Sequence, residues 1–193
     1  MRKTITFVTG NEYKFLLAKR ALAIFPSLLL ERRTIDFPEI QSCLNEEIAA
    51  YSARNISNLL QTPVIVSDAG FAIHALNGFP GPFIKYINDW LTPEDILAMM
   101  EGKTDRRAKF VDILAYAEPG QEPVLFHDEA SGVIAYKSSA TSKSPDLGMI
   151  NRIWIPDGSK KTSSEMPHEE LLAIWKNKKW NDLATHILSK DFF

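Results

Sequence analysis

The sequence lacks several features that would mark a secreted or membrane protein. Among its 193 residues Cys43 is the only cysteine, so no disulfide can form within the chain. No apolar run approaches the roughly 20 residues that a membrane span needs. The apolar stretch near the N-terminus breaks at Gly10-Asn11, which is too early for a signal peptide. We therefore expect a cytoplasmic protein with no membrane partner.

The chain also lacks an excess of charge of either sign. Lysine and arginine number 22 and acidic residues 24, giving a formal net charge of −2. Without a basic field, we expect no nucleic-acid partner. Hydrophobic residues make up 45% of the chain, which is enough for a core without disulfides at this length. We expect a single domain over residues 1–193.

The apolar pattern predicts strands that alternate with helices early and a long hairpin later. Strands are expected over residues 3–9, 28–35, 64–66, 71–76, 108–117, 123–137 and 153–155. Helices are expected over 11–25, from the cap Asn45 to Leu60, from Thr92-Pro93, and from about 167 to 188. Residues 138–146 are rich in Ser, Thr and Lys and are expected to be mobile. This order indicates a mixed α/β sheet.

The stretch FVTGNEYKF at 7–15 is the first candidate for binding chemistry. A strand-to-helix turn at Thr9-Gly10-Asn11 leaves backbone N–H groups free at the helix N-terminus, where phosphate binds well. Asn11 can cap the helix or donate to a phosphate, and Lys14 follows one turn later. The ordinary alternative is a solvated lysine on a surface helix, since the glycine spacing of a P-loop is missing.

A second candidate is VIVSDAGFAIHALNGFPGPFIKY at 64–86. Asp68 follows a buried strand, and Gly70 is expected to turn the chain sharply. A Gly/Pro-rich loop then leads to a helix that carries Lys85. An acid at a strand end beside a lysine is typical of a metal–phosphate pocket. Glu39, in DFPEIQS at 36–42, would by itself be only an exposed loop acid.

Taken together, these stretches resemble the inosine/xanthosine triphosphate pyrophosphatases in order and spacing. The motifs are TGNxxK, DFPEIQ and SDAGFxxxALNGFPGPFIKY, and the later segments RRAKF (106–110), LFHDEASGVIA (125–135) and WIPDGSKKTSSEMP (154–167) extend the likeness along most of the chain. The resemblance implies an elongated mixed α/β sheet in two lobes with a central nucleotide-binding cleft. It also implies a homodimer that uses Mg²⁺ to hydrolyse a nucleoside triphosphate to the monophosphate and pyrophosphate.

Carried over position by position, the resemblance also implies roles for individual residues. Glu39 and Asp68 would bind Mg²⁺, and Asp68 would activate the attacking water, with Lys14 also serving catalysis. The predicted substrate-binding residues are Thr9, Asn11, Lys14, Gly70, Phe83, Lys85, Trp175 and Lys176. Carboxylates combined with substrate phosphates are what magnesium favours.

The departures from the family pattern fall mainly on base recognition. The family's lysine on the second helix is Ser52 here, and the first acid of its D-D/E-D-S-G motif is Ser67. Its acid after the phosphate lysine is Leu17. Residues 147–152 replace its base-binding segment, and Trp175-Lys176-Asn177 replaces its S-H-R signature. We therefore expect an altered base preference, with Trp175 either contacting the base or packing in the core.

Two other functions stay open at this point. One is a nucleotide-binding or regulatory protein with little or no catalysis, and the other is a phosphatase for a different phosphorylated metabolite. The four histidines show no metal spacing, and Cys43 has no histidine near it in the sequence to activate it. The lysines at 176, 178 and 179 are expected to form a solvated helix face, and a phosphate contact from 137–143 can also be envisaged.

Overall fold

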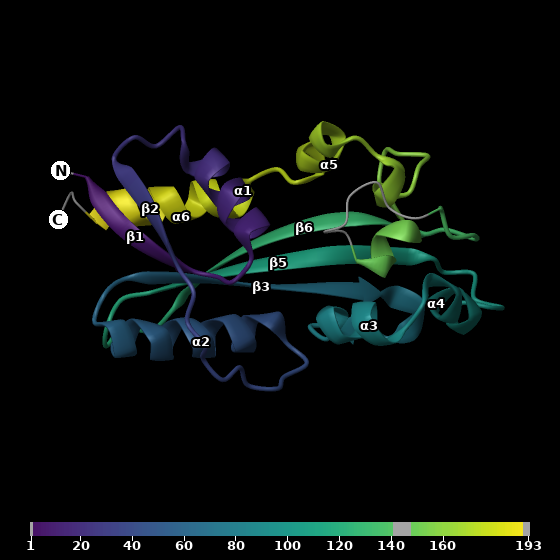
Figure 1. Ribbon diagram of the computed structural model, residues 1–193, viewed down its shortest axis with the longest axis horizontal. Helices are drawn as coiled ribbons and strands as arrows, with labels where there is room; N and C mark the ends of the chain where they lie inside the picture. The colour runs from purple at the N-terminus through teal and green to yellow at the C-terminus, as the bar shows by residue number, and fades with distance from the viewer. Residues whose placement is uncertain (1, 141–147, 191–193) are drawn as a thin grey trace. The chain divides into compact units, whose positions relative to one another are not determined.

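The computed structural model describes residues 2–140 and 148–190 (Figure 1). The strands are β1 (Lys3–Val8), β2 (Leu28–Arg33), β3 (Val64–Ile73), β4 (Pro80–Gly81), β5 (Arg107–Ala117), β6 (Val124–Ile134) and β7 (Trp154–Pro156). The helices are α1 (Glu12–Leu22), α2 (Asn45–Leu60), α3 (Ile84–Trp90), α4 (Pro93–Met99), α5 (His168–Ile174) and α6 (Lys178–Ser189). Most of the 138–146 stretch, including Lys143, lies outside the described residues, so its expected mobility stays a prediction.

The described strands form one mixed sheet in the order β2-β1-β3-β5-β6-β7, with β4 beside β3. β1 is parallel to β2, from Lys3↔Leu28 to Val8↔Arg33, and parallel to β3 over the last three residues of β1. β4 pairs with β3 in the antiparallel sense, as does β7 with β6. The mixed α/β class predicted from the sequence is therefore confirmed.

The chain divides into two compact units, which we call unit 1 and unit 2. Unit 1 comprises the described residues of 1–68, 112–128 and 177–193, and unit 2 those of 69–111 and 129–176. None of the helices in the described ranges is long and apolar enough to cross a membrane.

In unit 1, helices cover both faces of the strands (Figure 1). α1 and α6 pack against each other and lie on one face, while α2 lies on the other. The buried cluster under α1 and α6 includes Phe7, Ile65, Leu114, Trp180 and Leu183. Phe7 and Trp180 meet edge to face, with ring centroids 5.6 Å apart. This apolar layer fixes the faces to which neighbouring residues of β3 and β5 point, because side chains alternate along a strand.

The core of unit 2 is built around three aromatic rings. The Phe110 ring lies 4.6 Å from that of Phe71 and 4.8 Å from that of Trp154, centroid to centroid. α4 begins as predicted, at a capping box in which Thr92 and Asp95 exchange hydrogen bonds. Ile96 of this helix is fully buried in the same cluster.

The sequence prediction was wrong about β3. We expected one strand over 64–66, leading to Asp68, a sharp turn at Gly70 and a second strand over 71–76, but β3 runs unbroken from Val64 to Ile73. Gly70 is therefore an extended residue within the strand. The strand can continue because Ser67 and Asp68 find polar partners on opposite faces, so neither is left unpaired. The turn comes later, where Asn77 and Gly78 have φ of 53° and 87°.

Three helix ends also differ from the prediction. The expected helix over 167–188 breaks into α5 and α6 at Asn177, which takes a left-handed conformation with φ of 54°. Asn45 is the first residue of α2 rather than its cap, and the cap position is Leu44. α1 stops at Leu22, before the predicted end at residue 25. Asparagine tolerates left-handed backbone better than most residues, which explains the break at Asn177.

Candidate active site

The strand order of unit 1 places a ligand-binding position at the end of β1. From β1 the chain passes through α1 on one face to β2, and from β2 through α2 on the other face to β3 (Figure 1). Ligands of parallel α/β sheets bind beyond the carboxyl ends of the strands at such a switch point. β1 ends at Val8, which pairs with Val66, so Ser67 and Asp68 lie just past the end of β1.

The turn between β1 and α1 is held by its own side chains. Asn11 caps α1, and its Oδ1 accepts a hydrogen bond from the Lys14 N–H at 3.0 Å. The Asn11 N–H in turn donates to Thr9 Oγ1 at 3.1 Å. These two bonds orient the start of α1, where backbone N–H groups and the helix dipole favour an anion.

Lys14 connects this turn to β3. Its ammonium nitrogen lies 3.3 Å from Ser67 Oγ and 3.5 Å from the Ser67 carbonyl oxygen, and donates to both. The structure therefore brings one predicted phosphate ligand to the residue immediately before Asp68.

Asp68 is held from the opposite face of the sheet. Successive side chains of a strand point to opposite faces, so Asp68 faces away from Ser67 and toward α2. The amide of Asn45 donates to Asp68 Oδ2 at 2.7 Å, and Asn45 is itself buried. This bond fixes the orientation of a half-buried carboxylate, which the sequence had placed at a strand end and the structure places inside β3.

A buried ion pair lies behind Ser67, and the sequence analysis missed it. Ser67 Oγ donates to Asp112 Oδ1 of β5 at 3.0 Å, and Asp112 is ion-paired with Lys179 of α6. The Lys179 side chain is only 7% exposed, so its prediction as part of a solvated helix face was wrong. The available signal was Asp112 itself, because a charge inside the apolar run FVDILAYA needs a buried partner.

The predicted magnesium ligands are the carboxylates of Glu39 and Asp68. Glu39 lies exposed in the segment between β2 and α2. Within residues 2–140 and 148–190, no group of three or more His, Cys, Asp or Glu side chains could hold a metal ion by itself. Mg²⁺ is commonly held by only one or two carboxylates together with waters and substrate phosphates. Two carboxylates such as those of Asp68 and Glu39 are chemically suited to magnesium bound together with a polyphosphate rather than in a closed protein cage, and their joint role as ligands stays a prediction.

The predicted residues of unit 2 are spread over several elements. Gly70 is in β3, Phe83 precedes α3, and Lys85 is exposed on the first turn of α3. Trp175 follows α5 and packs, partly buried, against the core of unit 2, in agreement with the packing alternative. Lys176 beside it is exposed. Roles for these five residues in substrate binding stay predictions.

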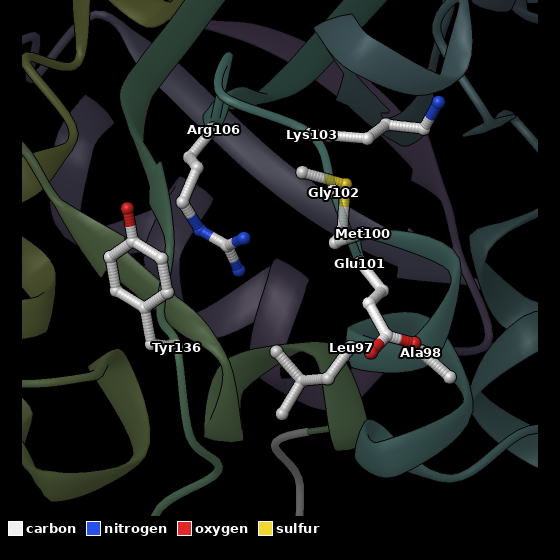
Figure 2. A pocket seen from close by; sticks show the side chains of 8 residues that line it. All are labelled: Leu97, Ala98, Met100, Glu101, Gly102, Lys103, Arg106 and Tyr136. Atoms are coloured by element: carbon white, nitrogen blue, oxygen red, sulfur yellow. The ribbon is translucent and has the colours of Figure 1, made fainter.

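Unit 2 also contains a pocket that includes none of the predicted residues (Figure 2). Its volume is about 460 Å³, and its walls come from the end of α4, the loop that follows and Tyr136. The Arg106 guanidinium lies 4.3 Å from the Tyr136 ring centroid, and its Nε donates to the Ile134 carbonyl at 2.7 Å. Arg106 thus ties the start of β5 to the end of β6, a structural role.

The fold and the site together define a class of protein. It is an α/β protein with a capped helix, a lysine and a carboxylate at the switch point of the parallel strands of its mixed sheet. Phosphate-binding proteins use this arrangement. The chain matches the Ham1 family over residues 5–179 and belongs to it. This confirms the family predicted from the sequence motifs.

Relatives with known names support the same family. The chain is 42% identical to the dITP/XTP pyrophosphatase of Methanopyrus kandleri over 170 residues, 88% of each chain. It is 37% identical to the inosine triphosphate pyrophosphatase of Emericella nidulans over 171 residues, 87% of each. The Ham1 protein of Staphylococcus aureus has the same fold, with a TM-score of 0.80 at 24% identity, and the match covers 97% of this chain and 100% of that one.

Proposed function

We propose that this chain is a magnesium-dependent nucleoside triphosphate pyrophosphatase that cleaves its substrate to the monophosphate and pyrophosphate. The names of its relatives support this class of enzyme. The observation that carries the proposal is the meeting of Lys14 with Ser67, directly before Asp68, at the switch point of the sheet. We further propose that the substrate is a non-standard or modified purine nucleotide, and that the protein is a cytoplasmic homodimer.

In the proposed reaction, Lys14, Asp68 and Glu39 have separate roles. The N-terminus of α1 and the ammonium group of Lys14 would bind the phosphates and neutralise charge that develops on the phosphoryl oxygens. Asp68, oriented by Asn45, would accept the proton of the water that attacks, while the bond between the α and β phosphates breaks and pyrophosphate leaves with its electron pair. Glu39 and Asp68 would hold Mg²⁺, which when bound supplies further charge neutralisation.

One observation keeps a second function in view. Ser52 stands where the family pattern described above places a lysine, and its hydroxyl is buried without a hydrogen-bond partner among the described residues. A site with one cation fewer can bind a nucleotide and turn it over slowly or not at all. The alternative is therefore a nucleotide-binding or regulatory protein on the same fold.

The test is pyrophosphate release in the presence of Mg²⁺ across a panel of standard, deaminated and modified nucleoside triphosphates. Asp68→Asn is measured beside the wild type, with Asp157→Asn, an exposed aspartate of unit 2, as the matched control. We expect turnover of one or a few substrates, abolished by Asp68→Asn and by EDTA but kept in Asp157→Asn. Turnover that survives in Asp68→Asn would contradict the mechanism. No turnover, with nucleotides still raising the melting temperature, would favour the binding protein.

A further inference from the structure

A continuous polar path runs through unit 1 from the predicted phosphate site into the interior. It begins at the Lys14 ammonium, passes through the Ser67 hydroxyl and the Asp112 carboxylate, and ends at Lys179. The four residues come from α1, β3, β5 and α6, so no local stretch of sequence contains them. The Lys179 side chain is 7% exposed, whereas Lys14 is only partly buried.

The hydrogen-bond directions along this path are fixed by chemistry. A serine hydroxyl has one proton to donate, and an ammonium group can only donate. The Ser67 proton points to Asp112 Oδ1 at 3.0 Å, so the lone pairs of Ser67 Oγ are left to accept from Lys14 at 3.3 Å. Asp112 thereby makes Ser67 an acceptor oriented toward Lys14.

The far end of the path holds Asp112 in place. The Asp112 side chain is only 19% exposed, and Lys179 supplies the partner that a largely buried carboxylate needs. Lys179 is itself held by α6, whose neighbouring Trp180 packs edge to face on Phe7 in the core. The packed core of unit 1 is therefore connected to the long Lys14 side chain through the hydroxyl of Ser67.

We propose that Asp112 and Lys179 are positioning residues for the phosphate site, which act through Ser67 to hold the ammonium group of Lys14 where the substrate phosphates bind. A free lysine side chain loses considerable rotamer freedom when it binds a ligand, and a lysine already held in place loses less. The inference rests on the proposed function, because it matters only if Lys14 contacts phosphate.

The decisive variant is Ser67→Ala, which cuts the path and leaves the Asp112–Lys179 pair intact. We expect it to weaken binding of inorganic tripolyphosphate with Mg²⁺ about tenfold by calorimetry, the size expected when one hydrogen bond to a charged group is lost. KM for the nucleotide should rise by a similar factor, while the urea midpoint should fall by no more than the loss of the Ser67–Asp112 hydrogen bond explains, so that the variant stays folded under assay conditions. Ser67→Thr keeps the hydroxyl on a β-branched side chain that suits a strand, so it should bind within about twofold of wild type.

Three comparisons separate this role from a general loss of packing. Ser57→Ala removes a buried serine hydroxyl of α2 that donates to the Arg54 carbonyl, away from the path, and should leave tripolyphosphate binding unchanged. In a Lys14→Met background, Ser67→Ala should have no further effect on binding, because the two residues act as a unit. The double variant Asp112→Leu/Lys179→Met removes both charges together with the acceptor of the Ser67 proton, and should weaken binding as Ser67→Ala does.

The outcomes also separate this inference from the proposed function. If the wild type binds tripolyphosphate and Ser67→Ala binds it equally well, the positioning role is overturned while the proposed function stands. If Ser67→Ala weakens tripolyphosphate binding as much in the Lys14→Met background as in the wild type, the positioning role is likewise overturned. If the wild type neither binds tripolyphosphate nor releases pyrophosphate from any nucleotide, the proposed function fails, and the inference fails with it.

Discussion

Unit 1 and unit 2 differ in what they bury. Unit 1 encloses an ion pair and a serine hydroxyl beside the predicted phosphate ligands, and its contacts join four separate elements. Unit 2 encloses three packed aromatic rings, and its predicted substrate residues are spread over β3, the start of α3 and the end of α5. Charges need specific partners in the interior, whereas aromatic packing tolerates exchange of one ring for another. We therefore propose that phosphate binding depends on the specific contacts of unit 1, and that base recognition by residues of unit 2 is freer to change.

The largest effect should come from breaking the buried pair of unit 1. Lys179→Met leaves the Asp112 carboxylate without its partner, and should lower the free energy of unfolding by about 3–5 kcal/mol. Urea denaturation measures the loss. Lys178→Met, next to it on the same helix, removes only an exposed pair with Asp182 and should cost about 0.3–0.5 kcal/mol. If both variants lose the same small free energy of unfolding, the Asp112–Lys179 pair contributes no more than an exposed pair. The contrast between the two units would then not hold.

A smaller effect is expected from the residue that orients Asp68. Asn45→Ala removes the amide that donates to Asp68 Oδ2, and a hydrogen bond to a charged group is worth about 1.5–3 kcal/mol. We expect kcat to fall about tenfold to a hundredfold in steady-state assays. Asn55→Ala is the control on the same helix, since its amide donates only to the Tyr51 carbonyl. An unchanged kcat in Asn45→Ala would show that Asp68 needs no support from α2.

The smallest effect should fall on unit 2. Lys176→Ala removes an exposed cation from the stretch that replaces the family's base-reading signature, and should change the ratio of kcat/KM between two bases by about tenfold or less. Binding of tripolyphosphate should not change. If instead all nucleotides and tripolyphosphate weaken together, Lys176 contacts phosphate and the contrast between the units does not hold.

The parts that the sequence predicted well depend on short stretches of chain. The turn from Thr9 to Lys14 and the helix start at Thr92-Pro93 each lie within six residues, so local rules are sufficient. The Asp112–Lys179 pair joins a strand and a helix that lie far apart in the sequence. The apolar run around Asp112 shows that its charge needs a partner, but no local pattern identifies Lys179 as that partner. β3 was broken in the prediction because Ser67 and Asp68 read as the end of a strand, although tertiary partners on each face allow it to continue.

The central claim is cleavage between the α and β phosphates, and product analysis tests it most directly. Wild-type protein is incubated with Mg²⁺ and its best substrate from the nucleotide panel, and the products are separated by anion exchange. The account predicts equal amounts of nucleoside monophosphate and pyrophosphate, with neither formed by Asp68→Asn. Nucleoside diphosphate and orthophosphate as the first products would contradict it.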